Sequence, residues 1–173
     1  MSDLIKDIIR RETGGDPDGG YTNDPDDPGG RTQFGISERA HPEAWADDKV
    51  TLDEATGIYD KKYIDQPDFD LIKNIHLQHQ LVDMGVPSGP QTAIRTLQQL
   101  VGVTVDGVIG PKTLAAIERY PAGLLFGYPV PGIVLLNLAV RDARILLYIG
   151  IVKRNVRKLK FLLGWVKRAL EFK

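Results

Sequence analysis

A glutamate at position 12 closes the first apolar stretch of the chain, in a setting that suggests acid–base chemistry. Leu4, Ile5, Ile8 and Ile9 recur at steps of three and four residues, so they form one apolar stripe of a helix. Glu12 lies four residues after Ile8 and falls on the same stripe. A carboxyl group that is desolvated there has a raised pKa and can act as a general acid. The alternative is a glutamate at a fraying helix end that turns out to water.

The segment that follows Glu12 is rich in glycine, aspartate and proline and has neither a helical nor a strand period. Its three glycine pairs permit positive φ and close backbone approach, and its prolines stiffen the turns. Two β-prone runs, residues 21–23 and 31–36, flank the sequence Asp-Pro-Asp-Asp-Pro-Gly-Gly. This pattern predicts a twisted hairpin with a long, rigid turn. The ligand spacing of an EF-hand is absent, so we do not expect a calcium site in this loop.

These residues resemble the glycoside hydrolase family 108 muramidases, a group that contains phage endolysins and lysozyme-like secretion activators. The family pattern begins with an apolar helix that ends in Glu. It continues with GGY-x-N-D-P-x-D-P-G-G-x-T-x-[FYW]-G-I-[TS], and residues 19–37 match this second part. Downstream, residues 83–98 look like its D-x-x-x-N-x-G…LQ region. Residues 106–113 look like its D-G-x-x-G-P-x-T turn, and residues 161–168 like its F-x-x-G-W-x-x-R ending. The resemblance therefore covers nearly the whole chain in order.

Two positions depart from the family pattern. In the family pattern, Glu-Gly-Gly-Tyr is usually contiguous. In this chain, residues 13–20 separate Glu12 from Tyr21. Either the loop is longer or the glycine pair aligns differently. The family's Asn before the central glycine is also replaced, since Pro87-Ser88 precede Gly89.

The resemblance implies a mainly α, lysozyme-like (α+β) fold with a small β-hairpin next to the catalytic helix end and a helical C-terminal part. It implies a catalytic part over residues 1–85 and a peptidoglycan-binding-like helical part over residues 86–173. We expect the two parts to pack as one compact unit and the protein to be a monomer. A length of 173 residues and an apolar fraction of 42% are sufficient for such a core.

The activity implied by the resemblance is that of a lysozyme (N-acetylmuramidase, EC 3.2.1.17), an endolysin that cleaves the β-1,4 bond between N-acetylmuramic acid and N-acetylglucosamine. Glu12 would protonate the leaving glycosidic oxygen. Asp27 and Thr32 are the candidates to stabilise the oxocarbenium-like centre or hold the attacking water, with Asp24 and Asp26 as rivals. The expected substrate-binding residues are Tyr21, Asn23, Gln33 and Phe34. No cofactor or metal is required.

Three other functions stay open at this stage. A lytic transglycosylase would keep the acid glutamate but close the sugar on itself without water. A non-catalytic cell-wall-binding or secretion-assisting protein is favoured by the interrupted spacing between Glu12 and Tyr21. A membrane-disrupting role for the cationic C-terminal helices could accompany either one.

Charge is distributed unevenly although the net charge is only −1. Residues 121–173 hold ten lysines and arginines against two acidic residues, a net charge of +8, which leaves −9 for residues 1–120. A basic segment of this kind favours an anionic cell-wall polymer, lipopolysaccharide or membrane, or it pairs with the acidic half. Basic and aromatic residues are not interleaved as in single-strand binders, so we expect no nucleic acid partner.

Helix signals are clear in the middle of the chain. Thr51 and Glu54 form a capping box that begins a helix running to about Ile64. Further helices are expected over about 70–84, ending at Gly85, and over 91–101. His76 and His79 lie three residues apart, but no third ligand follows at a suitable spacing, so they predict no metal site.

The end of the chain raises the question of a membrane span, because residues 120–140 carry no charge. Prolines and glycines divide this stretch into pieces too short to cross a bilayer, so we expect a loop and then a helix from about 132 to 151. The last helix, about 153–171, is amphipathic and basic. The N-terminal residues are charged throughout, unlike a secretory signal. We therefore expect synthesis in the bacterial cytoplasm and action on the wall in the periplasm.

Overall fold

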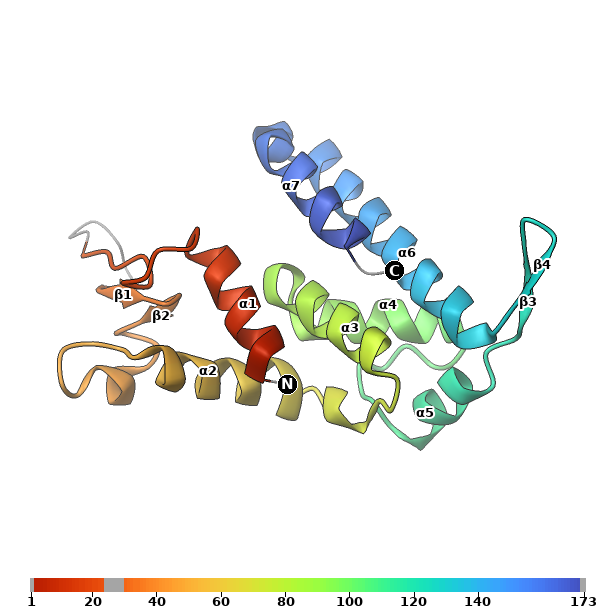
Figure 1. Cartoon of the computed structure of the whole chain (residues 1–173), viewed down its shortest axis with the longest axis horizontal. Coiled ribbons are helices and arrows are strands. Elements are labelled where there is room, and N and C mark those ends of the chain that lie inside the picture. Colours follow the sequence, from red (N-terminus) through yellow and green to blue (C-terminus); the bar gives the residue numbers. More distant parts are fainter. Residues whose placement is uncertain (1, 24–29, 172–173) are drawn as a thin grey trace. The chain divides into compact units, whose positions relative to one another are not determined.

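The computed structural model describes residues 2–23 and 30–171 (Figure 1). The chain forms two compact units, Met1–Ile64 and Asp65–Lys173, which we describe separately as the first and the second unit. The predicted fold class is confirmed, since the described residues are mainly helical and include a small antiparallel hairpin in the first unit. The boundary expected after residue 85 falls inside helix α3 (Ile75–Ser88), all of which belongs to the second unit.

The first unit is built on two α-helices that pack against each other. The apolar stripe of α1 is confirmed, because Ile5, Ile8 and Ile9 are at most 1% exposed. Helix α2 begins with the predicted capping box, in which Thr51 and Glu54 satisfy each other's backbone N–H groups. The elements in order are α1 (Ser2–Glu12), β1 (Thr32–Gln33), β2 (Ile36–Ser37), the 3-10 helix η1 (Pro42–Trp45), α2 (Leu52–Asp60) and the π-helical turn η2 (Lys61–Asp65).

The hairpin of the first unit differs from the predicted one. Residues 31–36 do not form one continuous strand, because the chain reverses at Phe34 and Gly35, both with positive φ (51° and 75°). Positive φ at both central residues is typical of a tight type I′ turn, which pairs β1 with β2. The predicted pairing of residues 21–23 with residues 31–36 is present as a single bridge between Thr22 and Thr32.

The second unit is a bundle in which α3 packs on α4, and both pack on the long helix α6. Helix α7 turns back along α6, as Figure 1 shows for these two helices. The elements in order are the 3-10 helix η3 (Phe69–Leu71), α3 (Ile75–Ser88), α4 (Pro90–Val101), α5 (Pro111–Glu118), β3 (Gly123–Leu125), β4 (Tyr128–Val130), α6 (Gly132–Arg154), the 3-10 helix η4 (Val156–Lys158) and α7 (Leu159–Leu170).

A buried charge cluster lies where three helices of this bundle meet. The carboxylate of Asp83 in α3 accepts hydrogen bonds from Arg144 in α6 and from Arg168 in α7. Arg144 Nε also donates to the hydroxyl of Tyr148 at 2.7 Å. The ring of Tyr148 lies 5.3 Å from that of Trp165, so this tryptophan of α7 packs against α6.

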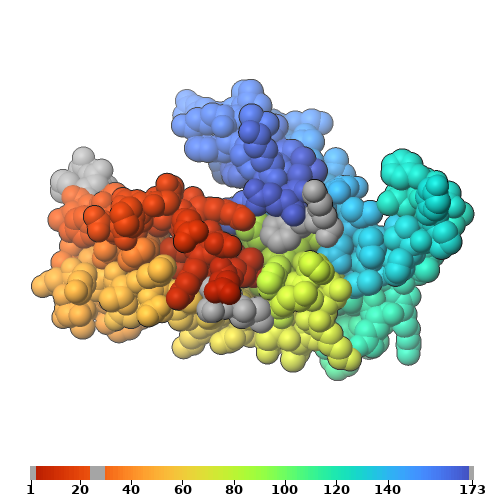
Figure 2. All heavy atoms as spheres, in the orientation of Figure 1, coloured from red at the N-terminus to blue at the C-terminus, as the bar shows by residue number. Residues whose placement is uncertain are grey.

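Two sequence expectations for the second unit need correction. Helix α3 does not end at Gly85 but continues through Pro87 to Ser88, because a proline near a helix end removes only one N–H donor. Residues 123–130, expected in a loop, form the β3–β4 hairpin, which stands out in the space-filling view (Figure 2). No helix among the described residues is long and apolar enough to cross a membrane.

Candidate active site

Glu12 is the last residue of α1, and its position is fixed by the way that helix ends. The N–H of Gly15 bonds to the carbonyl of Arg10 at 2.7 Å, and that of Gly14 bonds to Arg11 at 3.3 Å. Together with the positive φ of Gly14 (65°), these two bonds form a Schellman motif. The motif ends the helix one residue after Glu12 and so presents its side chain at the helix terminus.

The expectation that Glu12 is buried on the apolar stripe is wrong, because the residue is exposed. The buried stripe of α1 ends at Ile9, because the next three residues, Arg10, Arg11 and Glu12, are all exposed. Of the two alternatives that the sequence left open, the structure selects the helix end that faces water.

The additional residues between Glu12 and Tyr21 form a closed loop. Asp16 accepts a hydrogen bond from the N–H of Asp18 at 2.9 Å, which turns the chain back. Gly20 then returns to the helix end, where a Cβ placed on it would lie 3.7 Å from Cβ of Thr13. The glycine before Tyr21 therefore lies beside the residue after Glu12, although six residues lie between Thr13 and Gly20 in the sequence.

Thr32 is held beside this helix end by backbone pairing. Thr22 and Thr32 exchange two hydrogen bonds of 2.9 Å each, and Thr22 follows Gly20 by two residues. Thr32 is half-buried, and Asn23, next to the bridge, is exposed. The structure thus brings the end of α1 and β1 to one place through residues 20–22. Asp27 and its rivals Asp24 and Asp26 lie outside the described residues.

Tyr21 is an exposed aromatic side chain on this surface. It is 48% exposed, and its ring centroid lies 6.3 Å from that of the buried Trp45. The guanidinium of Arg31 lies over the Trp45 ring, 4.9 Å from its centroid. Trp45 is thereby fixed by a cation–π contact and supports Tyr21. An exposed, supported aromatic ring is chemically suited to stack on a sugar, and substrate binding by Tyr21 stays a prediction.

Gln33 and Phe34, also expected to line the sugar cleft, make contacts within the first unit. The Gln33 amide donates to the carbonyl of Asp18 at 3.0 Å and accepts from the N–H of Val50 at 2.9 Å. Phe34 is 9% exposed, and its ring packs so closely on Gly19 that a Cβ there would lie 2.5 Å from it. These two residues hold the loop against β1, with Phe34 buried and Gln33 half-buried.

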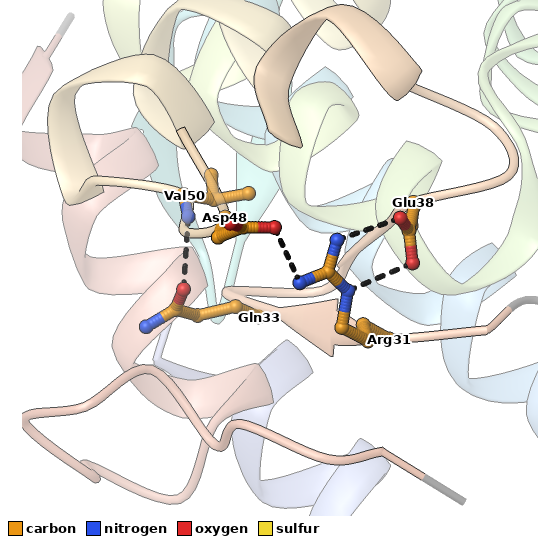
Figure 3. A network of polar contacts seen from close by, with 5 residues as sticks. All are labelled: Arg31, Gln33, Glu38, Asp48 and Val50. Atoms are coloured by element: carbon orange, nitrogen blue, oxygen red, sulfur yellow. Dashed lines mark hydrogen bonds and ion pairs between the residues drawn. The ribbon is translucent and has the colours of Figure 1, made fainter. Parts of the chain in front are cut away.

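An ion-pair network anchors β1 next to Thr32 (Figure 3). Arg31 donates to both oxygens of Glu38, at 2.9 and 2.7 Å, and to Asp48 at 3.0 Å. The hydrogen bond from Arg31 lowers the pKa of Glu38, and the two carboxylates raise the pKa of Arg31. Sequence reasoning missed this network. Arg31 stands at a variable position of the family pattern, and its partners follow 7 and 17 residues later.

Metal chemistry has no support in the described part of the chain, where no group of three or more His, Asp or Glu side chains could hold an ion. His79 is partly buried in α3, and burial lowers its pKa. His76 is exposed on the same helix. The segments linked at the end of α1 carry the exposed carboxyl group of Glu12, the half-buried Thr32 and the exposed ring of Tyr21.

Comparisons with known proteins agree with this geometry. Residues 7–89 match the model of the family described as Glycosyl hydrolase 108. That match contains Glu12, Tyr21, Thr32 and the whole ion-pair network. These residues belong to the glycosyl hydrolase 108 family. Residues 92–170 match a second family model, described as Predicted Peptidoglycan domain.

One solved structure resembles the family 108 chain along nearly its whole length. It is the structure of SagA from Brucella abortus, with 29% sequence identity and a TM-score of 0.63. The match covers 98% of this chain and 93% of SagA. A search of curated proteins gave no significant match. The two family models identify the protein as a lysozyme-like glycosidase that acts on peptidoglycan.

Proposed function

We propose that the protein is a muramidase that hydrolyses the β-1,4 bond between N-acetylmuramic acid and N-acetylglucosamine and so degrades the bacterial wall as an endolysin does. The observation that carries this proposal is the position of Glu12 at a fixed helix end, joined through Gly20 and Thr22 to β1 with Thr32. Glycosidic hydrolysis needs a proton donor for the leaving oxygen and a second group, usually a carboxylate, that activates water or stabilises the oxocarbenium-like centre. Glu12 would be the donor, and Thr32 would assist the second group.

In the proposed mechanism Glu12 donates its proton to the leaving glycosidic oxygen. A glycan bound over the helix end would exclude water from Glu12 and favour its neutral form, which a proton donor must have. The Thr32 hydroxyl would hold the water that attacks the oxocarbenium-like centre, and Asp27, which the family pattern places on the preceding turn, would accept its proton. Tyr21 would support one sugar ring, and the exposed Asn23 would bond to its polar groups.

The test is digestion of purified peptidoglycan by the wild type and by Glu12→Gln, with mass spectrometry of the soluble fragments. Reducing-end muramic acid products from the wild type, lost in the variant, would support the muramidase. Glu43→Gln is the matched control, because Glu43 is an exposed glutamate of the same unit and should retain full activity. Anhydro-muramic products would instead show a lytic transglycosylase, and no cleavage by the wild type would show a binding or accessory protein.

We also propose contact with an anionic membrane or lipopolysaccharide through the turn between α6 and α7. Residues 153–161 are all exposed and include five basic side chains. Val156, Leu159 and Phe161 are 70%, 56% and 49% exposed beside them. Cationic and apolar groups on one exposed segment favour an anionic lipid surface. Dye leakage from anionic vesicles caused by Glu12→Gln would support this role, and absence of leakage would remove it.

We further propose that the protein acts as a monomer on the wall in the periplasm after synthesis in the cytoplasm. Analytical ultracentrifugation of the purified protein measures its mass in solution, and the mass of a single chain is expected. Fractionation of producing cells during lysis tests the compartment, with the protein expected to move from the cytoplasmic to the periplasmic fraction.

A further inference from the structure

A cleft of about 480 Å³ lies within the second unit, far along the sequence from Glu12. Its walls come from the segment after η3, from α5 and from the first turn of α6, and the β3–β4 hairpin lies between the last two along the chain (Figure 1). Neither family model assigns a role to this cleft.

Aliphatic side chains form part of the interior of the cleft. Ile72 and Ile117 line it and are 3% and 7% exposed. Its wall at the start of α6 is fixed by close backbone contact, because a Cβ on Gly132 would lie only 1.7 Å from the carbonyl oxygen of Tyr120. These aliphatic side chains suit small methyl-bearing groups of a ligand.

The cleft also carries one cation and one anion. Lys73 Nζ and Glu118 Oε1 are 2.8 Å apart, and their side chains are 87% and 61% exposed. The pair raises the pKa of Lys73 and lowers that of Glu118, so both are charged at neutral pH. An ion pair so exposed contributes little to stability. Its two charges are accessible to a ligand that brings the opposite charges.

We propose that this cleft binds the stem peptide of peptidoglycan, a short peptide with methyl side chains, carboxylates and a free amino group. The methyl groups would pack on the aliphatic side chains of the cleft. A carboxylate would bond to Lys73, near the positive end of the α6 dipole at Gly132 and Ile133. The free amino group would bond to Glu118. The inference deepens the proposed function, on which it rests for peptidoglycan as the ligand. It assigns the glycan to the first unit and the peptide to the second.

The test uses the full chain with Glu12→Gln, so that no glycan is cleaved during the measurement. Calorimetric titration compares the free tetrapeptide L-Ala–γ-D-Glu–meso-diaminopimelate–D-Ala with the disaccharide N-acetylglucosaminyl-N-acetylmuramic acid. In this background, Lys73→Met and Glu118→Gln should each weaken tetrapeptide binding about tenfold, the effect expected for one hydrogen bond to a charged group. Lys112→Met, an exposed lysine of α5 outside this cleft, is the matched control and should not change binding.

The charge-exchanged variant Lys73→Glu/Glu118→Lys separates recognition from stability. It retains an ion pair but exchanges the positions of its charges, so the fold should be kept while tetrapeptide binding is lost. Unchanged binding in this variant, or no tetrapeptide binding in the Glu12→Gln parent, would overturn the proposal. Because cleavage is not measured, tetrapeptide binding can be confirmed even if the wild type proves not to be a muramidase, and the reverse also holds.

Discussion

Asp83 of α3 and Arg144 of α6 form an ion pair in which neither side chain has any solvent exposure. Arg168 of α7, 15% exposed, donates to the other oxygen of the same carboxylate at 2.8 Å. One carboxylate therefore joins three helices of the second unit. A buried pair of this kind contributes little when compared with apolar packing, but removing one partner leaves the other charge buried and uncompensated.

We therefore expect Asp83→Asn to lower the free energy of unfolding by about 3 kcal/mol or more. Asp142→Asn is the matched control, because Asp142 also pairs with an arginine of α6 but is 60% exposed, and it should cost less than about 1 kcal/mol. Urea unfolding followed by fluorescence measures both values. The chain has two tryptophans, Trp45 in the first unit and Trp165 in the second, so a Trp45→Phe background reports the second unit. Equal losses in the two variants would contradict this role of the pair.

The Asp83 cluster also shows what the sequence could not predict. The family pattern includes Asp83, but its arginine partners follow 61 and 85 residues later. No local pattern connects positions so far apart, since only the packing of the helices brings them together. Local features were predicted well because the residues that form them are close together in the sequence. The capping box at Thr51 and the apolar stripe of α1 depend on residues within one or two helical turns.

In the candidate site, too, the sequence predicted some features and missed others. The motif predicted which segments meet, and the structure joins Thr22 to Thr32 as a shortened form of the predicted pairing. Helical periodicity placed Glu12 on the apolar stripe but could not show that burial of this stripe ends at Ile9. Similarly, residue type suggested that Phe34 stacks on sugar, whereas Gly19 gives its ring a place in the core.

The contact between Gly19 and Phe34 predicts a difference between two glycines of one loop. Gly14 and Gly19 both have positive φ, at 65° and 71°, so replacing either with alanine strains the backbone by about 1 kcal/mol. A Cβ at Gly14 meets nothing within 4 Å, whereas at Gly19 it meets the Phe34 ring at 2.5 Å. Gly19→Ala should therefore lower the thermal midpoint of the first unit clearly more than Gly14→Ala. Calorimetry decides this, and similar midpoints would show that Phe34 moves aside freely.

The Arg31–Glu38 pair predicts a pH-dependent contribution to stability. The pKa of Glu38 in the folded protein lies below its ordinary value of 4.5, because Arg31 stabilises the carboxylate. The stabilisation is therefore complete above pH 4.5 and is lost as the pH falls through the folded pKa. Glu38→Gln should destabilise the first unit at pH 7 and have a smaller effect at pH 3. In an Arg31→Gln background the same substitution should lose this pH dependence. Urea unfolding at the two pH values tests the cycle, and an effect that is independent of pH in the wild-type background would refute it.

The close approach of Gly132 to Tyr120 makes the wall of the second-unit cleft sensitive to a single methyl group. An alanine Cβ at residue 132 would lie 1.7 Å from a backbone oxygen, which cannot move as the end of a side chain can. Gly150, in the same helix, has only the end of the Arg154 side chain near it, at 3.7 Å. Gly150→Ala should stabilise the protein by about 0.5–1 kcal/mol through helix propensity, whereas Gly132→Ala should destabilise it despite the same gain. Opposite shifts of the unfolding midpoint in the Trp45→Phe background are the expected result, and a stabilising Gly132→Ala would show that α6 can begin elsewhere.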